Sequence, residues 1–148
     1  MNLRKILSKD VIKIGLENTE KNAVIEELID LLMKSGKVND KQAALECVME
    51  RERKMSTGIQ FGIAIPHGKS DAVEEMVACI AVDKKGVDFD ALDREPSVIF
   101  IMTISPLQKT GPHVQFLAEI SQLLKEEDIR KKILASDNPE EILKIFCG

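Results

Sequence analysis

The chain has 148 residues, enough for one domain with a hydrophobic core of its own, and 31% of its residues are charged, as in ordinary globular proteins. Its net charge of −4 and its lack of tryptophan and tyrosine argue against a protein that binds nucleic acid. No apolar run is long enough to cross a bilayer, and the charged N-terminus lacks the apolar core of a secretory signal. We therefore expect a cytoplasmic protein with no direct membrane insertion.

The first third of the chain predicts a short strand followed by two helices. Residues 11–16 alternate weakly, as in a strand. Asn18 and Thr19 are good N-caps for a helix that ends at Gly36. A second amphipathic helix is expected over residues 40–55. Its last turns interleave Glu50 and Glu52 with basic residues, which predicts a solvated face for this part of the helix.

The middle of the chain predicts strands. The glycine-rich segment STGIQFGIAIPHGKS is unfavourable for a helix, and its apolar residues alternate as in a strand that stops at Pro66. Residues 76–82 form a second candidate strand, with 87–89 as a short extension. The run SVIFIMTI at 97–104 is continuous and β-branched, which predicts a strand buried on both faces. The alternating residues before Pro66 are Ile59, Phe61, Ile63 and Ile65.

Helices are predicted for the C-terminal third. The first is opened by Pro112, which suits a first helical turn, and two shorter ones are expected over residues 128–134 and from Asn138 onward. The residues predicted to line the inner side of the first of these helices are Val114, Leu117, Ala118, Ile120, Ser121 and Leu124. Because helices and strands are interspersed, the predicted class is α/β, a single domain with a mixed β-sheet flanked by α-helices.

His67 is one of only two histidines, and it lies between Pro66 and Gly68 at the end of a predicted strand. Ligands usually gather at strand ends in α/β sheets. Pro66 restricts Ile65 to extended conformations, and we expect Gly68 to let the backbone approach whatever His67 binds. The alternative is a turn histidine with no special role.

His113 follows Pro112, so it is expected in the first turn of its helix. The free N–H groups and positive dipole there favour an anion and disfavour an imidazolium, which keeps the ring neutral. An ordinary surface histidine is the alternative for this residue alone. Together with the permanently charged Arg51, two neutral imidazoles would form a plausible set for phosphoryl transfer, if the fold brings them together.

Other chemistry has less support in the sequence. There is no G-x-S-x-G elbow, P-loop or Rossmann fingerprint, so we expect no nucleotide and no other cofactor. The three cysteines, Cys47, Cys79 and Cys147, are far apart and form no C-x-x-C pair, which indicates free, mostly buried thiols in a reducing compartment. No pair of them has the spacing of zinc ligands with the histidines, so no metal site is expected.

Several of these motifs together resemble the fructose/mannitol (type 2) EIIA domains of the sugar phosphotransferase system, a family that includes the nitrogen-regulatory IIA proteins. The likeness covers about Leu3 to Phe146. It is carried by Arg51-Glu52, the segment STGIQFGIAIPHG, and His113 followed by Leu117-Ala118.

The resemblance implies that His67 is phosphorylated by the phosphohistidine of HPr, that His113 assists, and that Arg51 helps to hold the phosphoryl group. It also implies the family fold, a mixed sheet sandwiched by helices. A shallow apolar rim would serve both protein partners, and Ile59, Phe61 and Ile63 are candidates for it, with core packing as their alternative.

The resemblance leaves three functions open. In the first, the group passes to a cysteine of a IIB domain and, through the IIC membrane permease, to a sugar, with a fructose-type domain favoured. In the second, the chain is a nitrogen-regulatory protein whose phosphorylation state is read by binding partners. The third is a phosphorylation-dead binding module, against which the intact His67, His113 and Arg51 argue. Residues 1–148 are expected to form one EIIA domain, which favours a freestanding protein.

Overall fold

A mixed sheet of five strands forms the centre of the molecule, and it confirms the predicted class. The computed structural model describes all 148 residues. The sheet order is β1-β4-β5-β2, with β3 also paired to β5. β4 and β5 are antiparallel, whereas β1 is parallel to β4, and both β2 and β3 are parallel to β5. The strands are β1 (Ile12–Ile14), β2 (Ile63–Ala64), β3 (His67–Lys69), β4 (Val77–Val87) and β5 (Ser97–Ser105).

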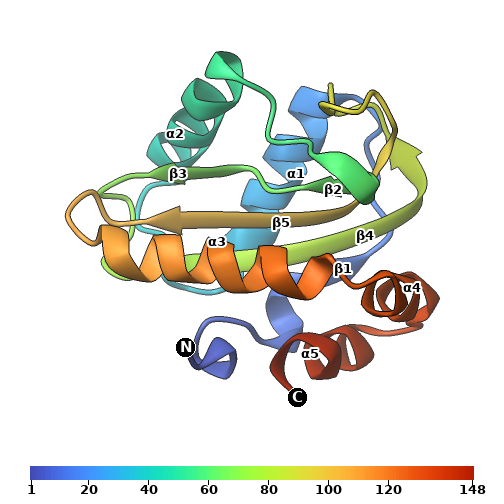
Figure 1. The fold of residues 1–148 in the computed structure, drawn as a ribbon. Coiled ribbons are helices and arrows are strands. Elements are labelled where there is room, and N and C mark those ends of the chain that lie inside the picture. The colour runs from blue at the N-terminus through green and yellow to red at the C-terminus, as the bar shows by residue number, and fades with distance from the viewer.

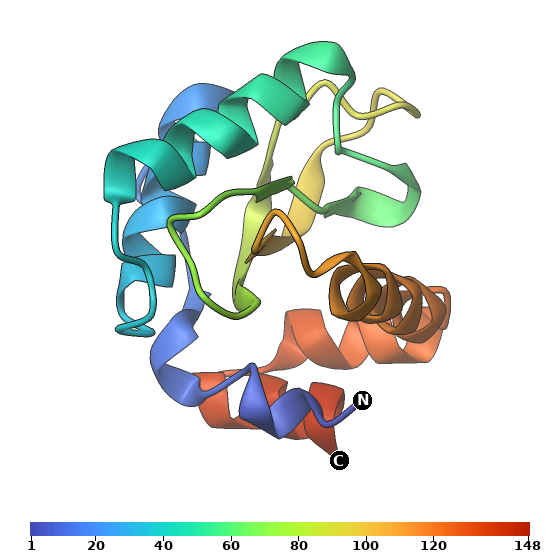
Figure 2. The same cartoon turned by 90° about the vertical axis from the view of Figure 1, so that its left-hand side faces the viewer.

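Helices cover both faces of this sheet (Figures 1 and 2). The two N-terminal helices pack on one face and the three C-terminal helices on the other. The two chain ends lie close together (Figure 1). None of the helices has the length and apolar character that a membrane span requires. The helices are α1 (Lys21–Met33), α2 (Lys41–Lys54), α3 (Thr110–Leu124), α4 (Glu127–Ala135) and α5 (Pro139–Cys147).

Strand β5 is buried on both faces, as its sequence predicts. Alternate side chains point to opposite sides of a strand. Phe100 and Met102 therefore pack with α1 and α2, whereas Ile99 and Ile101 pack with α3, α4 and α5. The sheet thus separates two hydrophobic cores, and the face of each residue on β5 follows from its register.

The edge strand beside β5 is interrupted at Pro66. β2 and β3 pair with β5 in one continuous register, with Ile63 opposite Ile99 and His67 opposite Thr103. Proline has no N–H for the ladder, but its carbonyl still accepts from the N–H of Thr103 at 3.1 Å. Thr103 lies in alternation with Ile99 and Ile101, so His67 lies on the face of the sheet covered by α3. The interruption thus separates His67 from β2 without changing the face.

The strand predicted from Ile59 is wrong in its first half. Residues Gln60–Gly62 form a short 3-10 turn instead, in which Phe61 has a φ of 65° and Gly62 a φ of 73°. Two successive residues with positive φ cannot belong to an extended strand. The turn exposes the Phe61 ring, which stacks on the guanidinium of Arg130 with 4.2 Å from the carbon Cζ to the ring centroid.

The N-cap of α1 also differs from the prediction. Glu20, rather than Asn18 or Thr19, caps the helix by accepting from the N–H of Ala23 at 2.9 Å. Asn18 instead bonds to the buried carboxylate of Glu27 through its main-chain N–H and its side-chain amide, at 3.0 and 2.8 Å. The bond to Glu27 holds the side chain of Asn18 ahead of the helix, so it is not available as a cap.

Gly68 is needed for helix packing rather than for ligand access. A Cβ atom at this position would lie 2.7 Å from Cys47 Sγ and 3.0 Å from the main-chain carbon of Cys47, on α2. We expect Gly68→Ala to lower the free energy of unfolding by about 1–3 kcal/mol, because α2 would have to move away from β3. Urea unfolding measures this, with Gly111→Ala as the control, since a Cβ at Gly111 meets nothing within 4 Å. Equal stability of Gly68→Ala and the wild type would contradict the packing.

Candidate functional site

His67 starts β3 directly after the interruption at Pro66, and the local backbone fixes its ring. Its Nδ1 lies 2.8 Å from the main-chain oxygen of Ile65. A carbonyl oxygen can only accept, so Nδ1 carries the proton and Nε2 is left with a free lone pair. The ring is half-buried. It therefore combines a fixed tautomer with access from one side, as a nucleophilic imidazole requires.

His113 lies in the first turn of α3, which runs across the same face of the sheet. The buried face of α3 consists of His113, Phe116, Ile120 and Leu124. Val114, predicted to point inward, is instead 65% exposed. The helix is rotated relative to the prediction because His113 and Phe116 occupy the inner face. The rings of His113 and His67 meet edge to face, with centroids 5.5 Å apart.

Ala118 and Ser121 were also predicted to face inward from α3, and both are exposed. Leu117 is half-buried, and only Ile120 and Leu124 lie in the core as predicted. The prediction followed small and apolar residues along the helix and gave no weight to a buried histidine. His113 Nε2 is buried and has no hydrogen-bond partner.

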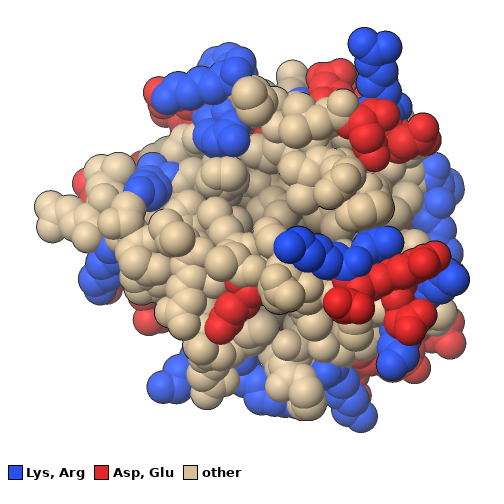
Figure 3. Space-filling model, viewed as in Figure 1, with Lys and Arg blue, Asp and Glu red and all other residues tan.

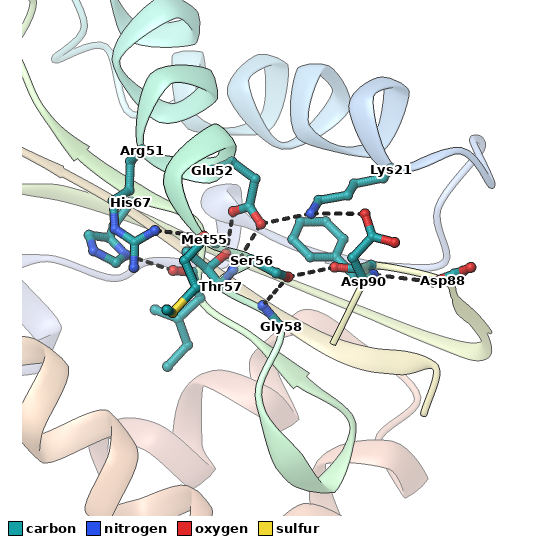
Figure 4. A network of polar contacts seen from close by, with 12 residues as sticks. Lys21, Arg51, Glu52, Met55, Ser56, Thr57, Gly58, His67, Asp88 and Asp90 are labelled. Atoms are coloured by element: carbon teal, nitrogen blue, oxygen red, sulfur yellow. Dashed lines mark hydrogen bonds and ion pairs between the residues drawn. The ribbon is translucent and has the colours of Figure 1, made fainter. Parts of the chain in front are cut away.

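Arg51 reaches the site from the last turn of α2. Its guanidinium lies beside the His67 ring in Figure 4. One nitrogen, Nη1, donates to the main-chain oxygen of Met55 at 2.7 Å. Arg53 is exposed on another side of the helix, as expected for a position two residues on. The fold thus brings together all three residues singled out in the sequence.

Both histidines are held in the neutral form. Burial lowers the pKa of His67 below its ordinary value of 6.5, and the nearby Arg51 acts in the same direction, against the opposing bond to Ile65 and the charge of Glu52. Burial also lowers the pKa of His113 to about 4, with smaller contributions from His67 and Lys69. A neutral His67 keeps its lone pair near pH 7, which nucleophilic attack requires.

We expect acidification to show these shifts directly. As pH falls, the histidines of the unfolded chain take up protons near pH 6.5, whereas those of the folded chain take them up only at lower pH. The neutral histidines therefore add fully to the free energy of unfolding above pH 6.5, and this contribution is lost as pH falls toward 4. Nitrogen-15 NMR titration should give two pKa values below 6.5, with that of His113 the lower. The loss of unfolding free energy between pH 7 and pH 5 should be smaller in His113→Asn. A His113 that titrates at its ordinary value would contradict the buried position.

Glu52 belongs to the motif Arg51-Glu52, but its sequence context did not predict a buried role for it. It was assigned with Glu50 to a solvated helix face, but Glu52 is 7% exposed. Its carboxylate accepts from the main-chain N–H and the hydroxyl of Thr57 and pairs with Lys21. The available signal was Ser56-Thr57-Gly58 directly after the helix, because these small polar residues can bond back to a carboxylate one turn earlier.

The three cysteines are free, as predicted. Cys79 is buried, whereas Cys47 and Cys147 are half-buried. Burial raises the pKa of Cys79 to about 12 and that of Cys47 to about 11. Their thiols therefore stay protonated near neutral pH and do not compete with His67 as nucleophiles.

The face around α3 carries a broad uncharged area. In Figure 3, charged side chains lie mainly around the rim, and uncharged atoms cover the middle of the view, which is hollowed. Of the predicted apolar rim, Phe61 is 49% exposed and Ile59 is half-buried, whereas Ile63 belongs to the core. These three residues also line an apolar cavity of about 100 Å³ against Leu124. Val114 adds an exposed side chain next to His113.

The site thus contains a fixed neutral nucleophile, a second buried imidazole and a permanent cation on a mixed sheet sandwiched by helices. These groups suit the transfer of an anionic group such as a phosphoryl group. Residues 5–147 match the family described as "Phosphoenolpyruvate-dependent sugar phosphotransferase system, EIIA 2", and the chain belongs to that family.

The similar proteins include both fructose-specific components of the phosphotransferase system and nitrogen regulatory proteins. The chain is 37% identical to the fructose-specific EIIABC component of Bacillus subtilis, over 99% of this chain and 23% of that protein. It is 35% identical to the fructose-specific EIIA component of Haloferax volcanii, over 99% of this chain and 95% of that one. The crystal structure of the nitrogen regulatory protein IIA-Ntr from Neisseria meningitidis matches with a TM-score of 0.89 and 27% identity, covering 96% of this chain and 97% of that one.

Proposed function

We propose that residues 1–148 act as one cytoplasmic EIIA domain that carries a phosphoryl group on Nε2 of His67. The observation that supports this most strongly is the bond from Nδ1 of His67 to the oxygen of Ile65, since it leaves Nε2 as the free nitrogen beside Arg51 and His113. The donor is the phosphohistidine of HPr, which the family relationship implies.

The transfer is an in-line exchange between two imidazoles. The lone pair of His67 Nε2 forms a bond to phosphorus while the bond from phosphorus to the HPr nitrogen breaks and leaves its electron pair on that nitrogen. The proton on His67 Nδ1 stays there, hydrogen-bonded to the main-chain oxygen of Ile65. Arg51 stabilises the charge on the equatorial oxygens, and its remaining N–H groups make no hydrogen bond within the chain. The unpaired Nε2 of His113 donates a further bond to the phosphoryl group.

We propose a fructose-type IIB domain as the acceptor, with its cysteine receiving the group and the IIC permease acting later on the sugar. Two fructose-specific relatives are 37% and 35% identical to this chain, compared with 27% for the nitrogen regulatory structure. Val114 is exposed next to His113, and Phe61 is exposed near the C-terminal end of the same helix, α3, so both suit a protein partner. A nitrogen-regulatory role is the second candidate, favoured by the TM-score of 0.89.

Transfer to a purified IIB domain tests the choice between these two roles. The chain is first phosphorylated by phosphoenolpyruvate, enzyme I and HPr, then separated and mixed with a fructose-specific IIB domain. We expect the phosphoryl group to move to the IIB cysteine within seconds to minutes, and a IIB domain with that cysteine replaced by serine to receive none. A phosphorylated chain that keeps its group in the presence of IIB would favour the regulatory role.

A further inference from the structure

Glu52 is a buried carboxylate directly next to Arg51 in the sequence. The main-chain N–H of Thr57 donates to its Oε2 at 2.8 Å, the Thr57 hydroxyl donates to its Oε1 at 2.5 Å, and Lys21 Nζ pairs with Oε2 at 2.9 Å. Figure 4 shows this carboxylate between Thr57 and Lys21. A buried charge is costly unless it is paired and hydrogen-bonded, and here both oxygens are engaged. These three contacts therefore fix the position of the Glu52 carboxylate.

Residues 55–58, which Glu52 holds through Thr57, are also held by the loop that follows β4. The Ser56 hydroxyl donates to the main-chain oxygen of Phe89 at 2.7 Å and accepts from the N–H of Gly58 at 3.0 Å. A Cβ on Gly58 would lie 2.9 Å from the Cα of Ala91, so the two backbones are in close contact. Residues 55–58 thus lie between Glu52 and the loop after β4, with little freedom to shift.

Both Arg51 and His67 depend on this segment for their positions. The main-chain oxygen of Met55 accepts from Arg51 Nη1 at 2.7 Å, while the Met55 side chain itself is 60% exposed. The main-chain oxygen of Thr57 accepts from the N–H of Ile65 at 3.0 Å. The oxygen of Ile65 in turn accepts from Nδ1 of His67 at 2.8 Å. Residues 55–57 therefore support Arg51 through Met55, and they support His67 through Thr57 and Ile65.

We propose that Glu52 is a positioning residue for phosphoryl transfer: by fixing Thr57, it sets the place of the Arg51 guanidinium relative to Nε2 of His67. This inference rests on the proposed phosphorylation of His67. Glu52 does not touch the phosphoryl group, because its oxygens already bind Thr57 and Lys21. It acts through geometry, and small displacements in such a site are costly for the rate of transfer.

The test compares Glu52→Gln with Glu27→Gln in steady-state transfer from phospho-HPr. Glu27 is a matched control: it is 9% exposed, pairs with Lys13 at 2.7 Å and holds the turn before α1 through main-chain N–H groups. That turn lies next to β1, at the opposite edge of the sheet from His67. We expect both variants to be less stable, but only Glu52→Gln to lose about 10- to 100-fold in kcat, with KM for phospho-HPr nearly unchanged.

A double-mutant cycle with Arg51→Met separates positioning from a general loss of structure. If Glu52 acts by positioning Arg51 against His67, then Glu52→Gln should lower kcat far less in the Arg51→Met background than in the wild type. In that background there is no guanidinium whose position Glu52 could set. Thr57→Val, which removes only one bond to Glu52, serves as a milder variant should Glu52→Gln fail to fold, and Thr57→Ser should restore the rate.

The outcomes are distinct. A folded Glu52→Gln, or a folded Thr57→Val if the former cannot be made, with kcat within about twofold of wild type would overturn the positioning role. An equal loss with and without Arg51 would also overturn it. If the wild type itself accepts no phosphoryl group from fully phosphorylated HPr, then it is the proposed function that fails, and this inference with it.

Discussion

Replacing His67 with alanine is expected to abolish phosphoryl uptake from phospho-HPr. No other group in the site can replace it, because Nε2 of His113 carries the proton that it donates to the phosphoryl group, and the thiols of Cys47 and Cys79 are held protonated. Intact mass measurement after incubation with phosphoenolpyruvate, enzyme I and HPr gives the result directly. The wild type should gain one acid-labile phosphoryl group, and His67→Ala should gain none.

The control for this experiment is His113→Ala. It removes the neighbouring ring, 5.5 Å from His67, but leaves Nδ1 of His67 bonded to Ile65. We expect it to take up the phosphoryl group more slowly than the wild type and to the same final level. Uptake by His67→Ala at the rate of the wild type would show that another residue carries the group.

Replacing Arg51 with methionine is expected to slow uptake by about 10²–10³-fold, the usual cost of losing one group that stabilises transition-state charge. Methionine keeps much of the side-chain volume but has neither the charge nor the N–H donors. Rapid-quench measurement of the first turnover checks the rate of transfer itself. Arg51→Lys should recover only part of the loss, because an ammonium lacks the planar fork of a guanidinium.

Arg53→Met is the matched control for Arg51. It removes the same charge from the same last turn of α2, but Arg53 is exposed and on another side of the helix. Its effect on uptake should be within about twofold at physiological salt, since exposed charges are well screened. Equal losses in the two variants would mean that net charge, rather than the place of Arg51, controls transfer.

The sequence predicts correctly those elements that have a clear hydrophobic pattern or a clear N-cap residue. β5 is long, β-branched and buried on both faces, and α5 begins with Asn138 accepting from the N–H of Glu141, as its sequence indicates. The three site residues were also identifiable, because their motifs resemble a known family. Local sequence patterns predict well only those segments whose structure does not depend on contacts with residues far away in the sequence.

The features that the sequence did not predict depend on tertiary contacts. The alternation of Ile59 and Phe61 is that of a strand, but two residues with positive φ turn the chain there and expose Phe61. The buried face of α3 includes His113, which meets His67, as well as the apolar Phe116, Ile120 and Leu124. Glu52 reads as part of a charged helix face, and only the return of Thr57 and the approach of Lys21 from α1 bury it.

The most direct test of the account is NMR of the phosphorylated chain with nitrogen-15 in its histidines. Coupling between phosphorus and nitrogen identifies the ring and the nitrogen that carry the phosphoryl group. We predict that phosphorus is bonded to Nε2 of His67, while Nδ1 keeps its proton and its bond to Ile65. A phosphoryl group on Nδ1 of His67, on His113 or on a residue that is not histidine would contradict the account.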